Sequence, residues 1–289
     1  MFGECHAHIA MDGVNYTAAM HRHECGPDEA HIRACFEAYR DRGISFVRDG
    51  GDKCGVSIAA KTIAPEYGID YRSPVFAIHK AGNYGSIVGR AFTSLREYAA
   101  LVDEAAALGA DYIKIMTTGI MNFNEFGRIT HHDLEAGEVA EMVHIAHERG
   151  LAVMSHTNGK RAVLDAVEAG VDSIEHGNYI DDDCIAALAE SQTCFVPTAT
   201  VARNLIGSGL FDDAVLARIA DASLGAIAAA IEAGCLVAIG SDAGAVGVLH
   251  GQGTCDEYAC FADAVADHAL LDARLAQGEA FIRKTFKRK

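Results

Sequence analysis

Short segments rich in β-branched and aromatic residues alternate with longer helical patterns along the whole chain. This alternation predicts parallel strands joined by helical crossovers, because antiparallel strands need only short turns. The expected strands span residues 2–8, 44–49, 73–79, 111–116, 151–156, 173–176, 194–198 and 236–241. Eight strands close a sheet, so we expect an α/β fold of the (β/α)8 TIM barrel type.

The helical patterns between these strands carry their own end signals. Several stop at a glycine that a strand follows within a few residues, as expected just past a helix C-terminus. These glycines are Gly43, Gly109, Gly150, Gly170 and Gly234. The expected helices span residues 28–42, 55–67, 94–108, 134–149, 160–169, 181–190 and 213–233, with closing helices at 254–266 and 269–286.

Composition narrows the class of protein. The 289 residues include four prolines and no Ser/Gly-rich linker, so we expect a single domain over residues 1–289. A formal charge of −16 disfavours nucleic acid and anionic membranes as partners. No apolar run approaches the length of a membrane span and no signal-peptide pattern opens the chain. Nine cysteines without a CxxC pair fit a reducing compartment. We expect a cytoplasmic protein acting on a small molecule, and homo-oligomerisation is left open.

Histidines at strand ends are the first chemical signal. In the expected strand 2–8, His6 and His8 are two residues apart and therefore point to the same face. An isolated His-x-His is more often structural than metal-binding. A TIM barrel offers a test, because its active site lies at the carboxyl ends of the strands.

Four further expected strands carry a polar side chain within, at the end of or just after the strand, and we place these side chains at the same rim. Lys114 lies in the otherwise apolar strand 111–116, where an unpaired ammonium would be costly. His156 and His176 end the strands 151–156 and 173–176, and Asp242 follows the strand 236–241. Five strands thus direct four histidines, a lysine and an aspartate to one rim of the barrel.

In these motifs the chain resembles the amidohydrolase superfamily of metal-dependent hydrolases. The stretches 110–116, 173–179 and 46–51 are most similar to its prolidase and imidazolonepropionase-like branch. The resemblance implies two divalent metal ions, and we expect them to be Zn²⁺. It places His6, His8 and Asp242 on one ion, His156 and His176 on the other, and Lys114, carboxylated by CO₂ to a carbamate, between them.

The chemistry of these residue types agrees with that implication. Imidazole and carboxylate groups suit Zn²⁺, and two neighbouring ions acidify water and polarise a scissile carbonyl. A buried Lys114 is accounted for if carboxylation removes its charge, although a structural salt bridge is the alternative. Asp242 is expected to take a proton from the attacking water and deliver it to the leaving amine. We assign catalysis to Asp242 and His176.

Four other residues are candidates for substrate binding. Tyr179 follows His176 and offers a phenol, and His250 lies in a glycine-rich segment after the last strand. Arg128 offers a planar fork for a carboxylate, and His79 ends the third expected strand. Each has an ordinary structural alternative. The loops 80–85 and 117–132 are expected to shape the pocket because they follow strands at the catalytic end.

One feature departs from the family pattern. Members of this branch carry a small β-sandwich formed before the first histidine motif and after the barrel, whereas only five residues precede His6 here.

Arg48 and Asp49 end the second expected strand, and we expect them to form an internal ion pair.

Three functions remain in competition at this point. The leading hypothesis is a binuclear metal hydrolase of amide-type C–N bonds, in a dipeptide, an N-acyl amino acid or a cyclic amide. A lactonase or phosphotriester-type hydrolase would use the same metal site on ester bonds. A non-catalytic metal-binding barrel is the alternative from another class. A deaminase is disfavoured because the His-x-x-Glu element is missing after His156.

Overall fold

The computed structural model describes residues 1–288. Its strands are β1 Glu4–Ala7, β2 Phe46–Asp49, β3 Asp70–Arg72, β4 Ala77–Lys80, β5 Gly89–Phe92, β6 Ile113–Met116, β7 Val153–Thr157, β8 Ser173–His176 and β9 Cys194–Val196. Its helices are α1 Tyr16–Arg22, α2 Glu29–Arg40, α3 Val56–Ile63, η1 Ala64–Tyr67, α4 Leu95–Ala107, α5 Ala136–Glu148, α6 Lys160–Glu168, α7 Asp182–Glu190, α8 Thr200–Arg203, α9 Asp213–Ala233, α10 Gln252–Ala264 and α11 His268–Thr285.

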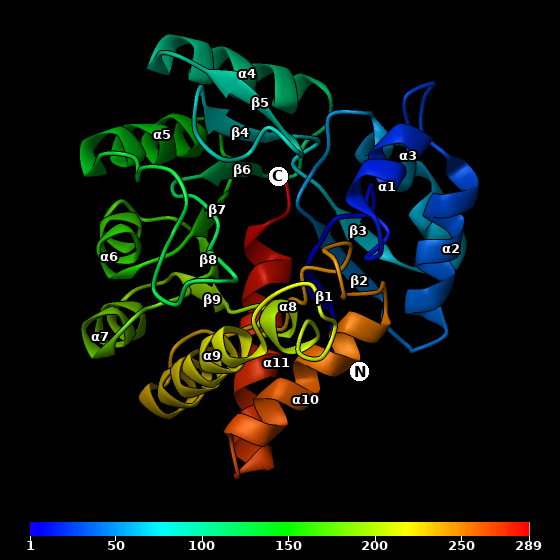
Figure 1. Ribbon diagram of the computed structural model, residues 1–289. Helices are drawn as coiled ribbons and strands as arrows, with labels where there is room; N and C mark the ends of the chain where they lie inside the picture. Colours follow the sequence, from blue (N-terminus) through cyan, green and yellow to red (C-terminus); the bar gives the residue numbers. More distant parts are fainter. Residues whose placement is uncertain (289) are drawn as a thin grey trace.

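All paired strands run parallel and form a ring with helices outside it (Figure 1). One sheet has the order β1-β2-β3 and the other β5-β4-β6-β7-β8-β9. Backbone hydrogen bonds join their free edges through the segment after α9. Phe195 N–H donates to Leu236 O and Cys5 N–H donates to Ile239 O, each at 2.8 Å. The expected α/β barrel class is confirmed.

The third expected strand, 73–79, is wrong in its bounds. The chain pairs with β2 as β3, bends, and pairs with β6 as β4. Pro74 at the bend has no N–H for a ladder, and Val75 has a φ of 68°, which a strand cannot contain. Asp111 N–H still donates to Ser73 O at 2.9 Å, so the bend keeps contact with the next strand.

The eighth expected strand, 236–241, is present only as isolated bridges. Val237 pairs with Phe195, and just beyond the expected range Ala243 pairs with Ala7. Gly240 lies so close to β1 that an added Cβ would stand 2.8 Å from the His6 Cβ. The segment therefore lies between β9 and β1 as expected, with interrupted ladders. Sequence analysis missed β5, α1 and α8 altogether.

Helix ends follow local signals in the sequence. Asp28 and Ser94 accept N–H bonds from the first turns of α2 and α4, as N-cap side chains do. The five glycines expected at helix C-termini all have a positive φ, between 70° and 90°. These glycines are confirmed as the points where the chain leaves a helix for the next strand.

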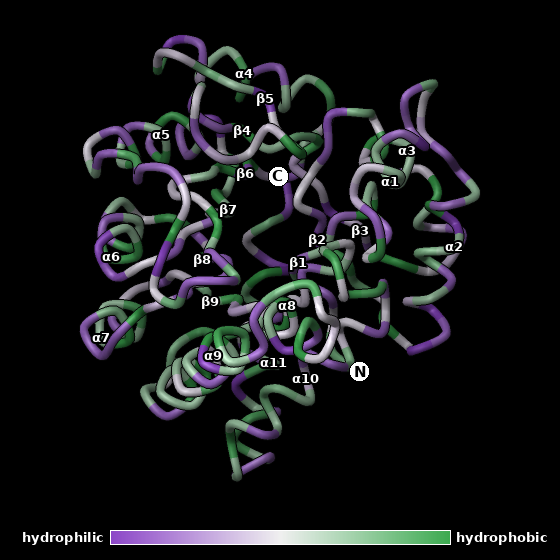
Figure 2. Tube along the Cα trace, in the orientation of Figure 1, coloured by the Kyte–Doolittle hydropathy of each residue, from purple (hydrophilic) through white to green (hydrophobic). Residues whose placement is uncertain are grey.

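The apolar core has two layers. The larger layer lies between the strands and the outer helices, so helices such as α6 alternate hydrophobic and hydrophilic positions along their length (Figure 2). A smaller layer fills the barrel interior with Cys5, Phe46, Met154 and neighbouring residues. Phe286, just after α11, packs its ring on Tyr112 at a centroid distance of 5.2 Å. Tyr112 directly precedes β6, so Phe286 covers the interior at the amino end of the strands.

Helix α9 is long and apolar enough to span a membrane by length and composition. In the structure it packs against α7, α8 and α10, and Leu216, Ile227 and Ile231 are buried. Core helices of soluble proteins pass the same test of length and composition, so this finding is weak evidence for a membrane. The expected absence of a membrane partner stays a prediction.

Candidate metal centre

Six of the expected site residues meet at the carboxyl end of the strands. Lys114 lies on β6, His156 on β7 and His176 at the end of β8. His6 lies on β1, His8 directly follows it, and Asp242 lies in the segment after α9. Donor atoms of His6, His8 and Asp242 all lie within 4.8 Å of one another. Asp242 Oδ1 is 3.4 Å from His8 Nε2 and 3.6 Å from His6 Nε2.

The second pair of imidazoles adjoins the first. The ring of His176 lies 4.9 Å from that of His6 and 4.5 Å from that of His156, measured between centroids. His156 Nε2–H donates to Gly119 O at 3.0 Å, and His176 Nδ1 lies 2.8 Å from Thr198 Oγ1. These bonds fix the orientation of both rings.

A buried carboxylate sets the tautomer of His6. His6 Nδ1–H donates to Glu175 Oε2 at 2.7 Å, which leaves Nε2 unprotonated, 3.6 Å from Asp242 Oδ1 and 3.2 Å from Lys114 Nζ. Glu175 Oε1 accepts from Arg48 Nη2 at 2.8 Å, and both side chains are fully buried. The Arg48–Glu175 pair therefore orients a candidate metal ligand.

This pairing corrects an expectation from the sequence. Arg48 does not pair with Asp49, because neighbours on a strand point to opposite faces. Asp49 instead accepts backbone N–H bonds from Ile9 at 2.8 Å and Gly51 at 2.6 Å. The sequence signal for the missed role of Glu175 was a charged residue inside a short buried strand.

Lys114 is buried with only 1% of its surface exposed. Its Nζ lies 3.2 Å from His6 Nε2, and no carboxylate oxygen of residues 1–288 lies within 4 Å of it. Burial lowers the pKa of Lys114 to about 8, against the opposing effect of Glu175. The structural alternative for this lysine, a close salt bridge, is absent within the described residues.

Burial also keeps the imidazoles neutral. It lowers the pKa values of His8 and His156 to about 3 and those of His6 and His176 well below the usual value, and Lys114 adds to each effect. Burial raises the pKa of Asp242 to about 7, although Lys114 opposes the shift. Neutral imidazole is the form that binds metal ions.

The residues present fit a divalent metal centre. His8 Nδ1 is buried and has no hydrogen-bond partner among residues 1–288. A Cβ on Gly50 would stand 2.1 Å from the His8 ring, so this position admits the ring only because it is glycine. His176 and Asp242 have φ angles of 72° and 60°, and such strained backbone clusters at functional sites.

A cavity of about 240 Å³ opens above these residues. His8, Lys114, His156, His176 and Asp242 line its floor. Both expected loops contribute to its wall, which is mainly apolar. The wall residues include Tyr84 and Ile87 near the first loop, Ile120, Met121 and Phe123 from the second, and Val201, Leu205, Phe211 and Val246 from the opposite side.

The four candidates for substrate binding lie outside the residues that line this cavity. Arg128 is exposed and pairs with Glu125 at 2.7 Å. Tyr179 packs edge-on against Phe126, and the Nδ1 of His79 lies 3.0 Å from Lys80 O. His250 is buried and bonds to Met11 O and Tyr39 Oη. Their contact with substrate stays a prediction.

Comparison with known proteins gives the family. The sequence profile described as Amidohydrolase family matches residues 5–273. The chain belongs to the amidohydrolase family. Solved structures share its fold. A Xaa-Pro dipeptidase with bound methionine has a TM-score of 0.79 and 20% identity over 98% of this chain and 75% of that chain.

Ochratoxinase of Aspergillus niger is similar in both sequence and structure. This amidohydrolase chain is 25% identical to it over 274 residues, which is 83% of this chain and 56% of ochratoxinase. The crystal structure of ochratoxinase has a TM-score of 0.77, with 97% of this chain and 71% of that chain covered. An uncharacterized protein of Mycobacterium tuberculosis is 28% identical over 78% of this chain. The chain thus spans a little over half the length of the curated relatives it matches.

Proposed function

We propose that this chain hydrolyses amide-type C–N bonds with a pair of divalent metal ions at the candidate centre. The observation that carries the proposal is the convergence of four neutral imidazoles, a carboxylate and a buried lysine, of which all but His6 line the floor of one cavity. The names of the similar proteins, an ochratoxinase and a Xaa-Pro dipeptidase, support hydrolysis as the reaction class.

The donors divide into two sets by their contacts. His6, His8 and Asp242 would hold one ion, and His156 and His176 the other, with Zn²⁺ the ion best suited to imidazole and carboxylate. We propose that Lys114 is carboxylated, since a carbamate removes a buried positive charge and provides two oxygens between the sets. When bound, such a pair of ions acidifies water and polarises the scissile carbonyl.

Asp242 is the residue we propose for proton transfer. Its carboxylate is the one acidic side chain of residues 1–288 that lines the cavity, and 16% of the side chain is exposed. From this position it can accept a proton from the attacking water and deliver it to the leaving nitrogen. His176, beside it on the floor, would hold the substrate carbonyl in place through its share of the metal pair.

The cavity wall favours an apolar substrate. Among residues 1–288, the sole lysine or arginine in the lining is Lys114 on the floor, and the wall is built from aromatic, methionine and aliphatic side chains. A substrate with a bulky uncharged group beside the amide would bury that group against Phe123, Met121 and Leu205. A free terminal carboxylate would find its nearest arginine outside this wall.

The test is metal content together with a substrate panel. The panel contains N-acyl amino acids and dipeptides with apolar or charged side chains, a cyclic amide, a lactone and a phosphotriester. We expect about two catalytic metal ions per chain and the highest kcat/KM on apolar amides. Turnover confined to the lactone or phosphotriester would assign the centre to ester bonds, and bound metal without turnover on any compound would make the barrel non-catalytic.

The single-domain organisation, the cytoplasmic location and a homo-oligomeric state are proposals of the same kind. Size-exclusion chromatography with light scattering measures the oligomeric state directly. A mass equal to one chain at micromolar concentration would remove the homo-oligomer.

A further inference from the structure

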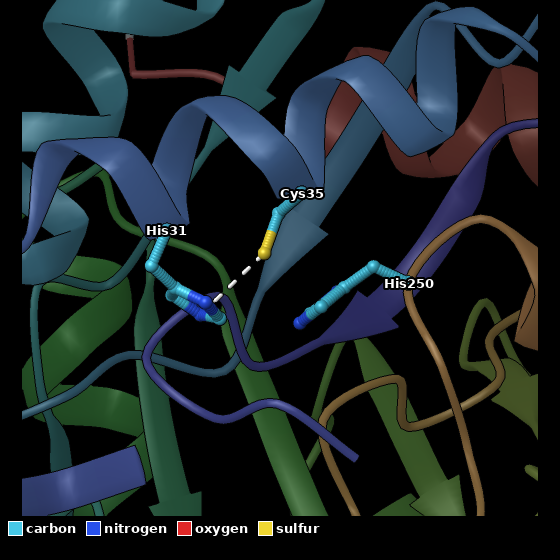
Figure 3. A group of neighbouring side chains, drawn as sticks. All are labelled: His31, Cys35 and His250. Carbon is cyan, nitrogen blue, oxygen red and sulfur yellow. Dashed lines mark hydrogen bonds between the residues drawn. The ribbon is translucent and has the colours of Figure 1, made fainter. Parts of the chain in front are cut away.

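A second group of metal-binding side chains lies outside the candidate metal centre. His31 and Cys35 are one turn apart on α2, and His250 reaches towards them from the segment before α10 (Figure 3). One donor atom from each residue lies within 4.8 Å of the other two. We call this group the His31–Cys35–His250 cluster. It shares no residue with the six residues of the candidate centre.

The separation of the donors suits a metal ion. His31 Nε2 lies 3.5 Å from Cys35 Sγ. In a tetrahedral zinc site with bonds of about 2.0 Å to nitrogen and about 2.3 Å to sulfur, that edge is about 3.5 Å long. The spacing of four residues on a helix directs both side chains to one face. Two ligands are therefore at the required separation before any ion binds.

The imidazoles of the cluster are already held in orientation. His31 Nε2–H donates to Ile9 O at 2.9 Å and His250 Nε2–H donates to Met11 O at 2.8 Å. His250 Nδ1 accepts from the Tyr39 hydroxyl at 3.0 Å. Both carbonyls belong to the segment just after His8. These bonds hold both rings beside Cys35 in the metal-free protein, and the two Nε2–H bonds would be exchanged for bonds to an ion.

An open cavity reaches the cluster. Its volume is about 530 Å³, and the charged side chains in its lining are Asp12, Asp28, Arg22 and Arg42. Arg22 lies 3.3 Å from Asp12 and 3.9 Å from Asp28. The two carboxylates and the two guanidinium groups cancel, so the lining adds no net charge to that of an ion. The cavity also leaves room for water as a fourth ligand.

We propose that the His31–Cys35–His250 cluster binds one zinc-class divalent ion, separate from the catalytic pair. On binding, the Cys35 S–H bond breaks, its proton passes to solvent and the sulfur pair forms the metal bond. Each imidazole stays neutral, because Nε2 gives up its bond to the Ile9 or Met11 carbonyl for the ion and its proton moves to Nδ1. His250 Nδ1–H would then donate to Tyr39 Oη, and the Arg22 Nη1–H that lies 3.0 Å from His31 Nδ1 would turn away. The ion would tie α2 to the His250 segment.

Cobalt substitution separates this cluster from the catalytic centre. The six residues of that centre include no cysteine, so a thiolate-to-Co²⁺ charge-transfer band in the near ultraviolet reports the cluster alone. The full-length protein, with its divalent ions exchanged for Co²⁺, should show this band and bind one equivalent more than the catalytic pair. Cys35→Ser should lose the band and that equivalent and keep its hydrolytic activity.

Two further variants complete the design. Cys25→Ser changes an exposed cysteine outside the cluster and should keep the band at full intensity. His31→Gln keeps a donor for Ile9 O and should weaken Co²⁺ binding at the cluster by more than about tenfold. Absence of the band at saturating Co²⁺ in the wild-type protein overturns the proposal. So does a band that persists in Cys35→Ser, because Cys35 is the thiolate the cluster requires.

The result is independent of the proposed function. A protein that shows the band and hydrolyses no amide retains the cluster site and loses the catalytic proposal. A protein that hydrolyses amides and shows no band retains the catalytic proposal and loses the cluster site. In the second case the two histidines serve only as hydrogen-bond donors to the segment after His8.

Discussion

Polar and charged side chains differ in their bonding partners at the two ends of the barrel. At the carboxyl end, His8 Nδ1 has no hydrogen-bond partner and Lys114 Nζ has no carboxylate within 4 Å among residues 1–288. At the amino end, Asp172 Oδ2 accepts the Val153 N–H and contacts His147 Nε2, both at 2.7 Å. Groups left incompletely bonded at one end are available for a ligand, whereas satisfied groups at the other end stabilise the fold.

The amino end repeats one arrangement. Asp111, just before β6, accepts the Ser73 N–H at 3.1 Å and pairs with Lys61 of α3 at 2.8 Å. Asp172, just before β8, likewise accepts the N–H of Val153 on β7 and pairs with His147 near the end of α5. Each aspartate joins a neighbouring strand to an outer helix. Changes here should affect stability, and changes at the carboxyl end should affect activity.

The largest effect is expected for Asp242→Asn. The amide cannot accept the proton of the attacking water, so kcat should fall by about 10²- to 10⁴-fold. The melting temperature should stay close to that of the wild-type protein, because Asp242 makes no salt bridge that holds the fold. Steady-state kinetics and thermal unfolding measure both quantities. An unchanged kcat would remove Asp242 from the mechanism.

Lys114→Ala should lose most of its activity, because the proposed bridge between the two donor sets is lost. Added acetate or propionate should restore part of it by entering the space of the missing side chain. The matched control is Lys61→Ala at the amino end, which should lower stability and leave kcat unchanged. Wild-type activity in Lys114→Ala would exclude a bridging carbamate.

Glu175→Gln tests whether the bond between Glu175 and His6 controls the metal affinity of the candidate centre. Gln keeps the shape but removes the charge that fixes the His6 tautomer, so metal affinity should fall by about 10- to 100-fold. Competition with a chelating dye measures this affinity. Activity at saturating metal should recover towards the wild-type value. Unchanged affinity would reduce Glu175 to a structural partner of Arg48.

The smallest effect is expected at the amino end, for His147→Gln. Hydrogen bonding to Asp172 raises the pKa of His147 above its usual value. The stability from this raised pKa is fully present below about pH 6.5 and is lost as pH rises through the folded-state pKa. With 41% of the side chain exposed, solvent screening limits the contribution to about 0.5 kcal/mol.

Denaturant unfolding at pH 5.5 and pH 8.5 measures this contribution. The variant should be less stable than the wild-type protein at the lower pH, and the two should converge at the higher pH. His144→Gln, an exposed position on the same helix, is the control and should show a smaller pH-dependent difference. A deficit for His147→Gln that grows with pH would contradict the ion pair.

Sequence reasoning located most of the elements because strands and helices have different periods and the helix ends carry glycine signals. It placed the strand that contains Pro74 and Val75 wrongly, since the bend there depends on pairing with two different neighbours. The interrupted ladder around Gly240 likewise depends on the close approach of β1. Such tertiary constraints have no periodic signature.

At the candidate centre, barrel topology let the sequence predict which side chains meet. The structure brings His6, His8, Lys114, His156, His176 and Asp242 together, while their role as ligands stays a prediction. The orienting pair Arg48 and Glu175 was missed, because pairing across the barrel interior is visible only when strands β2 and β8 are placed. The His31–Cys35–His250 cluster joins residues more than 200 positions apart and has no local motif.

The most direct test of the catalytic proposal is amide hydrolysis before and after metal removal. An apolar N-acyl amino acid serves as substrate for the protein as purified, after chelation, and after addition of Zn²⁺. Activity should disappear on chelation and return with about two equivalents of Zn²⁺ in the Cys35→Ser background, where the His31–Cys35–His250 cluster takes none. Full turnover by the metal-free protein would contradict the account.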